Sequence, residues 1–433
     1  MRDLLVTAVI FGAIPFILAR PYVGVFVWSW ISYMNPHRMS WGFAYNMPFA
    51  AITAIAVFIG MFFSKEPKRI PWTPVTIVWL LFVIWMCITT VFALTPHAAG
   101  ELDRTLKIQL MTLVTLMLMG SRERIHQLIW VITLSIGFFG IKGGVFVLAT
   151  GGAYKVWGPA GSFITGNNEL ALALIIVLPL MWYLRLQTDN KWLRHGFMVA
   201  MALMVFSILA SYSRGAFLAG TAMLLMLWIK SRHKMVIGVT MVVVVTIALA
   251  FMPEKWSERM ETIETYQEDG SAMGRINSWW FAYNLAKDRP LVGGGFHTFT
   301  KELFYKYAPN PENFHDAHSI YFEVLGEQGF VGLILFLTMW LLTFRTGSWI
   351  VRKTRDVENL TWARDLAAMI QVSLVGYAVG GAFLGLAYFD LPYHLMAIVV
   401  LIRMIVEQEL AADESLERDS LASEPARITA RGY

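Results

Sequence analysis

The sequence has little cysteine, little charge and no internal repeat. Its single cysteine, Cys87, lies inside an apolar run, which excludes a disulfide framework and a Cys-based metal site. Charged residues make up 15% of the 433 residues and hydrophobic residues 57%, a balance that argues against a soluble globular protein. The lack of a repeat counts against the transporter folds that are built from duplicated halves.

The formal net charge of +5 is spread over short loops between apolar runs. Membrane proteins concentrate Lys and Arg in the loops of one face, so topology explains these residues and no nucleic-acid partner is expected. The first apolar segment leads directly into further apolar sequence, and we therefore predict no cleavable signal peptide.

Apolar runs follow one another along almost the whole chain. They lie at residues 4–34, 47–63, 73–94, 105–120, 126–149, 168–186, 194–210, 215–229, 235–252, 320–345, 365–388 and 391–408. We predict an all-α polytopic membrane protein with about twelve transmembrane helices and one large, partly helical periplasmic loop. The first run is too long for one straight span and is interrupted at Arg20-Pro21. It makes either two crossings or one crossing in two staggered pieces, and we favour one net crossing.

Loops rich in Lys and Arg alternate with loops that are poor in them. The rich loops contain Lys65, Lys68 and Arg69; Arg122 and Arg124; Lys191 and Arg194; Lys230, Arg232 and Lys234; and Arg352, Lys353, Arg355 and Arg364. The poor loops carry single cations, which are Arg38, Arg104, Lys155 and Arg214. The positive-inside rule makes the rich loops cytoplasmic. The N-terminus is then also inside, if the first run makes one net crossing.

This topology predicts three parts. Residues 1–408 form a transmembrane helical domain, residues 253–317 form a large periplasmic loop inserted in it, and residues 409–433 form a cytoplasmic, disordered tail. The acidic first half of the loop, EKWSERMETIETYQEDG, predicts an exposed helix. The segment Arg275–Ala286 predicts an amphipathic helix that lies at the membrane interface through its aromatic side chains.

Three side chains of the outer face have complementary chemistry. Arg214 and Arg275 can hold a diphosphate through forked hydrogen bonds. His318 stands where the long loop re-enters the membrane as a helix, and the positive end of the helix dipole favours the neutral imidazole that accepts a proton. Each residue has an ordinary alternative: a snorkelling arginine, a solvated loop charge and a satisfied interfacial histidine. Asp316 can cap the helix or orient a nearby ring.

Two other features compete for a functional role. Glu101 and Asp103, in GELDR, can hold a divalent cation, although a solvated turn explains them as well. Lys142 lies within an apolar helix about two turns from its outer end, where an ammonium needs a partner or a water-filled cavity.

Several segments together resemble a known superfamily. In chain order they are GSFITGNNELALAL, SYSRGAFLA, DRPLVGGGFHTF and HDAHSIYFEVLGEQGFVGLILF, which is this family's order, over about residues 160–345. The superfamily contains O-antigen ligases, O-antigen polymerases and bacterial O-oligosaccharyltransferases. The N-terminal third, with its WGPAGSF segment, is similar to the O-glycosylation ligases encoded with exosortase systems.

The resemblance implies an inner-membrane O-antigen ligase of lipopolysaccharide biosynthesis. It would move a glycan from undecaprenyl diphosphate to a sugar hydroxyl of lipid A–core on the periplasmic side, by an inverting, metal-independent reaction without a cofactor. His318 would activate the acceptor hydroxyl, and Arg214 and Arg275 would bind the diphosphate. Further substrate-binding candidates are Lys142, Asn167, Asn168, His315 and Trp279.

Three alternatives stay open on the sequence. A protein O-oligosaccharyltransferase would use the same residues with a Ser or Thr acceptor, and an O-antigen polymerase would use a second lipid-linked glycan. A lipid-glycan transporter would need polar groups through the middle of the membrane, whereas here they gather at the outer face. Sequence does not determine the acceptor or the oligomeric state.

Overall fold

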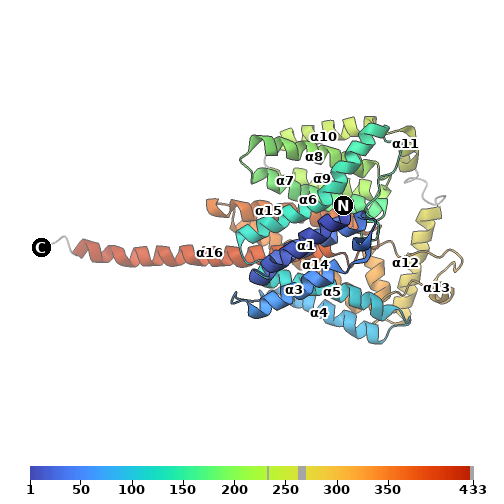
Figure 1. Ribbon diagram of the computed structural model, residues 1–433, viewed down its shortest axis with the longest axis horizontal. Helices are drawn as coiled ribbons and strands as arrows, with labels where there is room; N and C mark the ends of the chain where they lie inside the picture. Colours follow the sequence, from blue (N-terminus) through green and yellow to red (C-terminus); the bar gives the residue numbers. More distant parts are fainter. Residues whose placement is uncertain (232–233, 262–269, 430–433) are drawn as a thin grey trace.

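The computed structural model describes residues 1–231, 234–261 and 270–429 (Figure 1). The protein is 77% helical and has no strand in the part that is described, which confirms the all-α prediction. The first helices are α1 (Arg2–Ala19), α2 (Tyr22–Met34), α3 (Phe49–Phe63), α4 (Pro74–Val91), α5 (Ala98–Leu118), α6 (Arg122–Thr150), α7 (Asn167–Leu186) and α8 (Lys191–Leu209). They are followed by α9 (Arg214–Lys230), α10 (Lys234–Ala250), α11 (Glu254–Glu261), α12 (Gly270–Asp288), α13 (Lys301–Tyr307), α14 (Ile320–Lys353), α15 (Thr361–Gly381) and α16 (Asp390–Thr429). Short 3-10 helices lie at Pro36–Met39, Phe43–Asn46 and Glu358–Leu360.

Each predicted apolar run lies on a helix, but the predicted total of about twelve spans is not confirmed. Within the described residues, 6 helices are long and apolar enough to cross a membrane, namely α1, α4, α6, α7, α8 and α14. Several of the others are shorter or carry charged residues in their first turn. For example, α3 has 15 residues, and α5 begins with the charged sequence GELDR.

Helix α7 is the centre of the bundle. Every residue from Leu170 to Met181 is buried, because the helix is apolar on all sides and packs against α6, α8, α9 and α15. A helix that is apolar all round belongs inside a helical assembly rather than at its surface. Helix α1 lies at the periphery, where most of its side chains are exposed.

Helices α1 and α2 form a hairpin, so the first apolar run is not the single net crossing that we favoured. The chain turns at Arg20 and Pro21, since proline cannot donate the backbone hydrogen bond that would continue α1. Ile10 of α1 and Ile31 of α2 share one small apolar cluster. The first and last residues of the hairpin therefore lie at the same end of the bundle, which differs from one crossing made of two staggered pieces.

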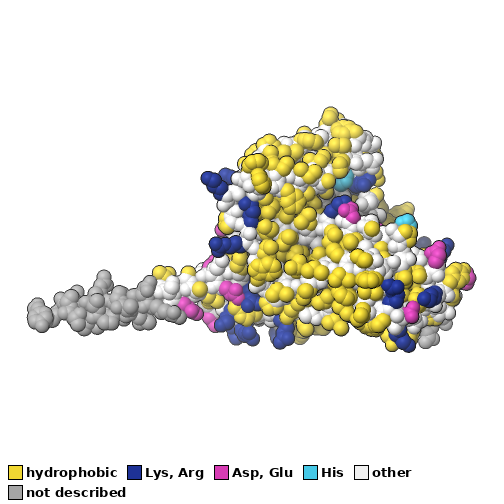
Figure 2. Space-filling model, turned by 90° about the horizontal axis from the view of Figure 1, so that it is seen from below, with side chains coloured by type: hydrophobic (Ala, Val, Ile, Leu, Met, Phe, Trp, Pro, Cys, Tyr) yellow, Lys and Arg dark blue, Asp and Glu magenta, His cyan; other side chains and the backbone are white. Residues whose placement is uncertain are grey.

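The two ends of the bundle differ in charge. Arg124 donates from both terminal nitrogens to the carboxylate of Glu66 at 3.0 Å, which joins two of the predicted cytoplasmic loops at one end. We call this the basic end, and α16 extends beyond it (Figure 1). Hydrophobic side chains cover the middle of the molecular face seen in Figure 2, and Lys and Arg gather toward the ends. Such a belt is typical of a membrane-spanning surface.

The long segment between α10 and α14 covers the other end of the bundle with α12 and α13 (Figure 1). Helix α12 confirms the helix predicted at residues 275–286 and packs against α14. Helix α11 begins the predicted acidic helix, whose later residues 262–269 lie outside the described part. Helix α16 continues to Thr429, and Ala, Leu, Glu and Arg in its last part favour a helix.

A glycine-rich loop interlocks with a break in α14. At Gly329 the helix has a left-handed φ of 68°, and two loop amides donate to the carbonyls that precede the break: Gly294 to Gly326 and Gly295 to Glu327, at 2.8 and 2.9 Å. A Cβ atom at Gly329 would lie 2.3 Å from the carbonyl oxygen of Leu291. The motifs PLVGGGF and GEQG therefore contact each other through their backbones.

Candidate functional site

His318 lies two residues before α14, in a segment held by α12. Its φ is 41°, a conformation that only a few per cent of non-glycine residues adopt. The indole nitrogen of Trp279 donates to the carbonyl of Ala317 at 3.0 Å, and its ring stacks on Phe322 at 5.1 Å with an interplanar angle of 7°. Trp279, predicted to bind substrate, thus holds the backbone beside His318.

His315 has a similar place in the structure. Its ring packs against Gly274 of α12, where a Cβ would lie 2.2 Å from the imidazole, and its carbonyl accepts from Ser278 at 2.8 Å. These contacts dock the segment that carries His318 onto α12. His315, the other substrate-binding candidate of this segment, therefore has a packing role in the structure.

The electrostatics of His318 keep its ring neutral. Burial lowers the pKa of His318 below its ordinary value of 6.5, and the nearby charge of Arg275 lowers it further. Asp316 acts in the opposite direction and raises this pKa. A neutral imidazole at neutral pH can accept a proton from a hydroxyl. The structure thus brings two of the three predicted catalytic residues, His318 and Arg275, into one electrostatic neighbourhood.

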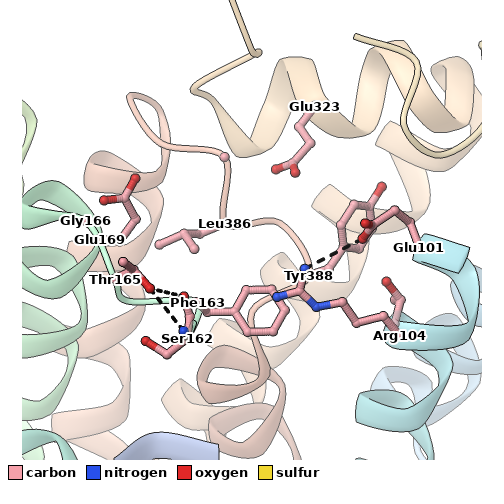
Figure 3. A pocket seen from close by; sticks show the side chains of 12 residues that line it. Glu101, Arg104, Ser162, Phe163, Thr165, Gly166, Glu169, Glu323, Leu386 and Tyr388 are labelled. Atoms are coloured by element: carbon pink, nitrogen blue, oxygen red, sulfur yellow. Dashed lines mark hydrogen bonds and ion pairs between the residues drawn. The ribbon is translucent and has the colours of Figure 1, made fainter. Parts of the chain in front are cut away.

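A two-part cavity opens beside His318. The first part, which we call the His318 chamber, measures about 290 Å³. It is lined by Glu101, Glu169, Phe296, His297, Phe299, Asp316, Ala317, His318, Glu323, Glu327, Gly385 and Tyr388. The second part, which we call the large chamber, measures about 370 Å³ (Figure 3). It is lined by Glu101, Arg104, Thr105, Ser162, Phe163, Thr165, Gly166, Glu169, Glu323, Gly385, Leu386 and Tyr388. The two chambers share lining residues and are therefore adjacent.

Four helices begin around this cavity. Glu101, Glu169 and Glu323 stand in the first turns of α5, α7 and α14, and Tyr388 lies just before α16. The N-terminal end of a helix carries a partial positive charge, which stabilises an acidic side chain in the first turn and also attracts an anion from solution. This end of the bundle thus combines acidic side chains with dipoles that suit a phosphate group.

Arg214 lies near the cavity but does not line either chamber. Ser213 caps α9 by accepting from the amide of Ala216 at 3.2 Å, so that Arg214 is the first residue of the helix. Asn167 donates its side-chain amide to the carbonyl of Ser211 at 2.6 Å and ties the start of α7 to this turn. The neighbouring Asn168 shares a 3.4 Å hydrogen bond with Asn167. Both asparagines, predicted to bind substrate, therefore take part in positioning the turn that carries Arg214.

Two other predicted features are not brought together at the cavity. Lys142 is exposed on α6 and lines neither chamber. Asp103 pairs with Lys107 at 2.5 Å on an exposed face of α5, whereas Glu101 lies 3.8 Å from Arg104 and lines both chambers. The two carboxylates of the alternative cation site therefore do not share one location. No group of three or more metal-ligating side chains occurs among the described residues.

Sequence reasoning missed the carboxylates that α14 contributes. Glu327 is buried and accepts from the amide of His297 at 3.0 Å and from the hydroxyl of Tyr388 at 2.8 Å. Glu323 accepts from the amide of Ala387 at 3.0 Å. Two acidic residues four positions apart in an apolar helix were a usable signal, because a carboxylate in such a helix requires partners.

Comparison with known families agrees with this geometry. Residues 199–337 match a family described as O-antigen ligase, and residues 1–188 match a family of unknown function, DUF5935. No curated protein matches the chain. The O-antigen ligase match contains Arg214, Arg275 and His318 and therefore confirms the resemblance found in the sequence motifs. Residues 199–337 of the chain are thus similar to the O-antigen ligase family.

Proposed function

We propose that this protein is an O-antigen ligase that transfers a glycan en bloc from undecaprenyl diphosphate to a sugar hydroxyl of lipid A–core. The reaction would take place at the periplasmic face of the bacterial inner membrane. The observation that carries this proposal is the position of His318, which lies in the segment that matches the O-antigen ligase family, lines a cavity and feels the charge of Arg275.

The residues would divide the chemistry between them. The acceptor oxygen forms a bond to the anomeric carbon of the glycan while the bond from that carbon to the diphosphate breaks. His318 takes the proton of the acceptor hydroxyl as general base. Arg275 and Arg214 neutralise the charge that develops on the departing diphosphate. Attack opposite to the leaving group inverts the anomeric carbon.

The diphosphate is a good leaving group, so catalysis requires orientation and charge neutralisation rather than a covalent enzyme intermediate. The polar groups gather at this one end, which supports a surface reaction on a membrane lipid over transport of that lipid through the bundle.

A reconstitution with separate acceptors tests the proposal. Purified protein in detergent is given undecaprenyl-diphosphate-linked glycan from the host, together with lipid A–core, an acceptor protein or no added acceptor. We expect a glycosylated lipid A–core, seen as a ladder of larger lipopolysaccharide on a gel. Glycan on the protein, or longer lipid-linked chains without an acceptor, would instead show an O-oligosaccharyltransferase or a polymerase. No transfer in any arm, with intact donor and folded protein, would contradict all three reactions.

A further inference from the structure

We propose that the large chamber is a glycan-binding subsite, supplied mainly by the N-terminal residues 1–188. Eight of its twelve lining residues belong to this segment, which matches a family of unknown function. The choice of a sugar as ligand rests on the proposed function. The inference goes beyond it, because it assigns a role in substrate recognition to the part of the chain outside the O-antigen ligase match.

An aromatic ring and a cation form the floor of the chamber. The guanidinium of Arg104 lies over the ring of Phe163, with 4.2 Å between Cζ and the ring centroid (Figure 3). This guanidinium also lies 3.8 Å from the carboxylate of Glu101, and the Arg104 side chain is 53% exposed. The guanidinium thus lies between a ring and a carboxylate, and its exposed part can donate hydrogen bonds to a ligand. A flat apolar ring beside fixed charged donors suits a pyranose, which has an apolar C–H face and a rim of hydroxyls.

The loop that carries Phe163 is held by its own hydroxyl groups. Ser162 donates to the carbonyl of Pro159 at 2.8 Å, and Thr165 donates to the carbonyl of Ser162 at 2.7 Å. Because these bonds fix the loop before a ligand arrives, little entropy is lost when a sugar binds against the ring.

Acceptors for sugar hydroxyls surround this platform. Carboxylates of Glu101, Glu169 and Glu323 line the chamber from three different helices (Figure 3). The oxygen atoms of a carboxyl group can accept several hydrogen bonds from hydroxyl groups. A sugar hydroxyl can therefore donate a hydrogen bond to one of these carboxyl groups and accept one from Arg104.

The large chamber lies next to the predicted base. It shares five lining residues with the His318 chamber, namely Glu101, Glu169, Glu323, Gly385 and Tyr388. A sugar in the large chamber is therefore adjacent to the place where His318 would act. Its volume of about 370 Å³ falls in the range of small-molecule pockets. The sugar belongs to the glycan of the donor or to the core of the acceptor, and binding measurements separate the two.

The test measures binding without the lipid parts. Mild acid frees the glycan from the host's undecaprenyl diphosphate and the core oligosaccharide from its lipid A, and each is titrated calorimetrically into full-length protein. The variants are Arg104→Ala, Arg104→Lys and Phe163→Leu. The matched control is Arg403→Ala at the basic end, where Arg403 pairs with Glu407 at 2.8 Å and lies over Trp349 at 5.1 Å. It removes the same kinds of contact away from the chamber.

We expect one of the two oligosaccharides to bind, with the same Kd for wild type and Arg403→Ala. Arg104→Ala and Phe163→Leu should weaken binding by about tenfold, and Arg104→Lys should restore it only in part. The subsite proposal would be overturned if Arg104→Ala and Phe163→Leu bound the oligosaccharide as tightly as wild type. It would also be overturned if both variants had a lower Tm than Arg403→Ala and this instability accounted for their weaker binding. No binding of either oligosaccharide to wild type would also overturn it.

Transfer assays on the same preparations keep the two proposals apart. Oligosaccharide binding that depends on Arg104 and Phe163, in a protein that transfers nothing, would leave the subsite standing and contradict the ligase reaction. Transfer with an unchanged KM for donor and acceptor in these variants would contradict the subsite and leave the ligase reaction standing.

Discussion

The charge of Arg275 acts on His318, but the two side chains have different predicted roles: His318 takes a proton and Arg275 binds the diphosphate. His318→Ala should leave donor binding nearly normal and lower transfer by roughly a hundredfold or more, the loss expected for a general base. Arg275→Ala should weaken donor binding as well as transfer, and Arg275→Lys should rescue only in part because an ammonium lacks the forked geometry.

Donor binding is measured with purified protein and lipid-linked glycan. The matched control is His195→Ala, an exposed histidine near the start of α8. Wild-type transfer by His318→Ala would place the base elsewhere.

The lowered pKa of His318 has a consequence for the pH profile. Transfer needs the neutral ring, so activity is present above the pKa of His318 and is lost as the pH falls through it. We expect the acid limb of kcat/KM for the acceptor to lie below pH 6.5, the ordinary value for histidine. Asp316 raises this pKa, so Asp316→Asn should move the limb to still lower pH. A limb that moves upward or stays in place in Asp316→Asn would contradict the assignment.

In the proposed mechanism, Arg214 and Arg275 take the place of a metal ion. Because guanidinium groups supply the positive charge that a divalent cation would otherwise provide, EDTA should leave the rate of transfer unchanged. The measurement compares rates before and after chelation and dialysis. A large loss that magnesium or manganese restores would instead assign a central role to the carboxylates of the cavity, with Glu101 first among them.

The residues in the sequence motifs could be predicted from the sequence, whereas the residues that contact them in the fold could not. His318 and Arg275 stand in recognisable motifs, and the structure brings them together. Trp279 and His315 share those motifs, but their rings and carbonyls hold the backbone of the segment. Glu327 escaped prediction because its two partners, His297 and Tyr388, are distant in sequence and meet it only in the fold.

At the level of helices, the break in α14 depends on glycine. Gly329→Ala puts a Cβ at a φ of 68° and 2.3 Å from a backbone oxygen, and it should destabilise the protein by about 2 kcal/mol or more. Thermal unfolding in detergent measures the change as a lower Tm. Gly12→Ala in α1 is the control, since no atom lies within 4 Å of the added Cβ and the helix there is regular. An equal Tm in the two variants would mean that the interlock contributes little.

Hydropathy predicts where helices lie better than how they connect. The runs at 168–186 and 126–149 correspond closely to α7 and α6, because long apolar segments have strong patterns. The hairpin of α1 and α2 was one of two alternatives left open by the sequence, since Arg20-Pro21 signals a break but not the angle of the following turn. That angle is fixed by packing between the two helices, which composition does not encode.

For the whole molecule, orientation in the membrane is the first prediction to test. We expect the α12 end to face the periplasm and the basic end to face the cytoplasm. In a Cys87→Ala background, Ser271→Cys should react with an impermeant maleimide on intact spheroplasts, and Ser415→Cys only after lysis. Both positions are exposed. The opposite pattern would invert the orientation and place the cavity in the cytoplasm.

The interlock between the glycine-rich loop and the broken helix limits how this protein can be recombined with its relatives. A chimera that exchanges only the residues outside the membrane would separate Gly294 and Gly295 from the helix carbonyls to which they donate. The α14 segment around Gly329 must therefore be exchanged together with the loop. Moving one contiguous block, from α12 through the break in α14, would keep this backbone contact intact, whereas moving the outer loops alone would not.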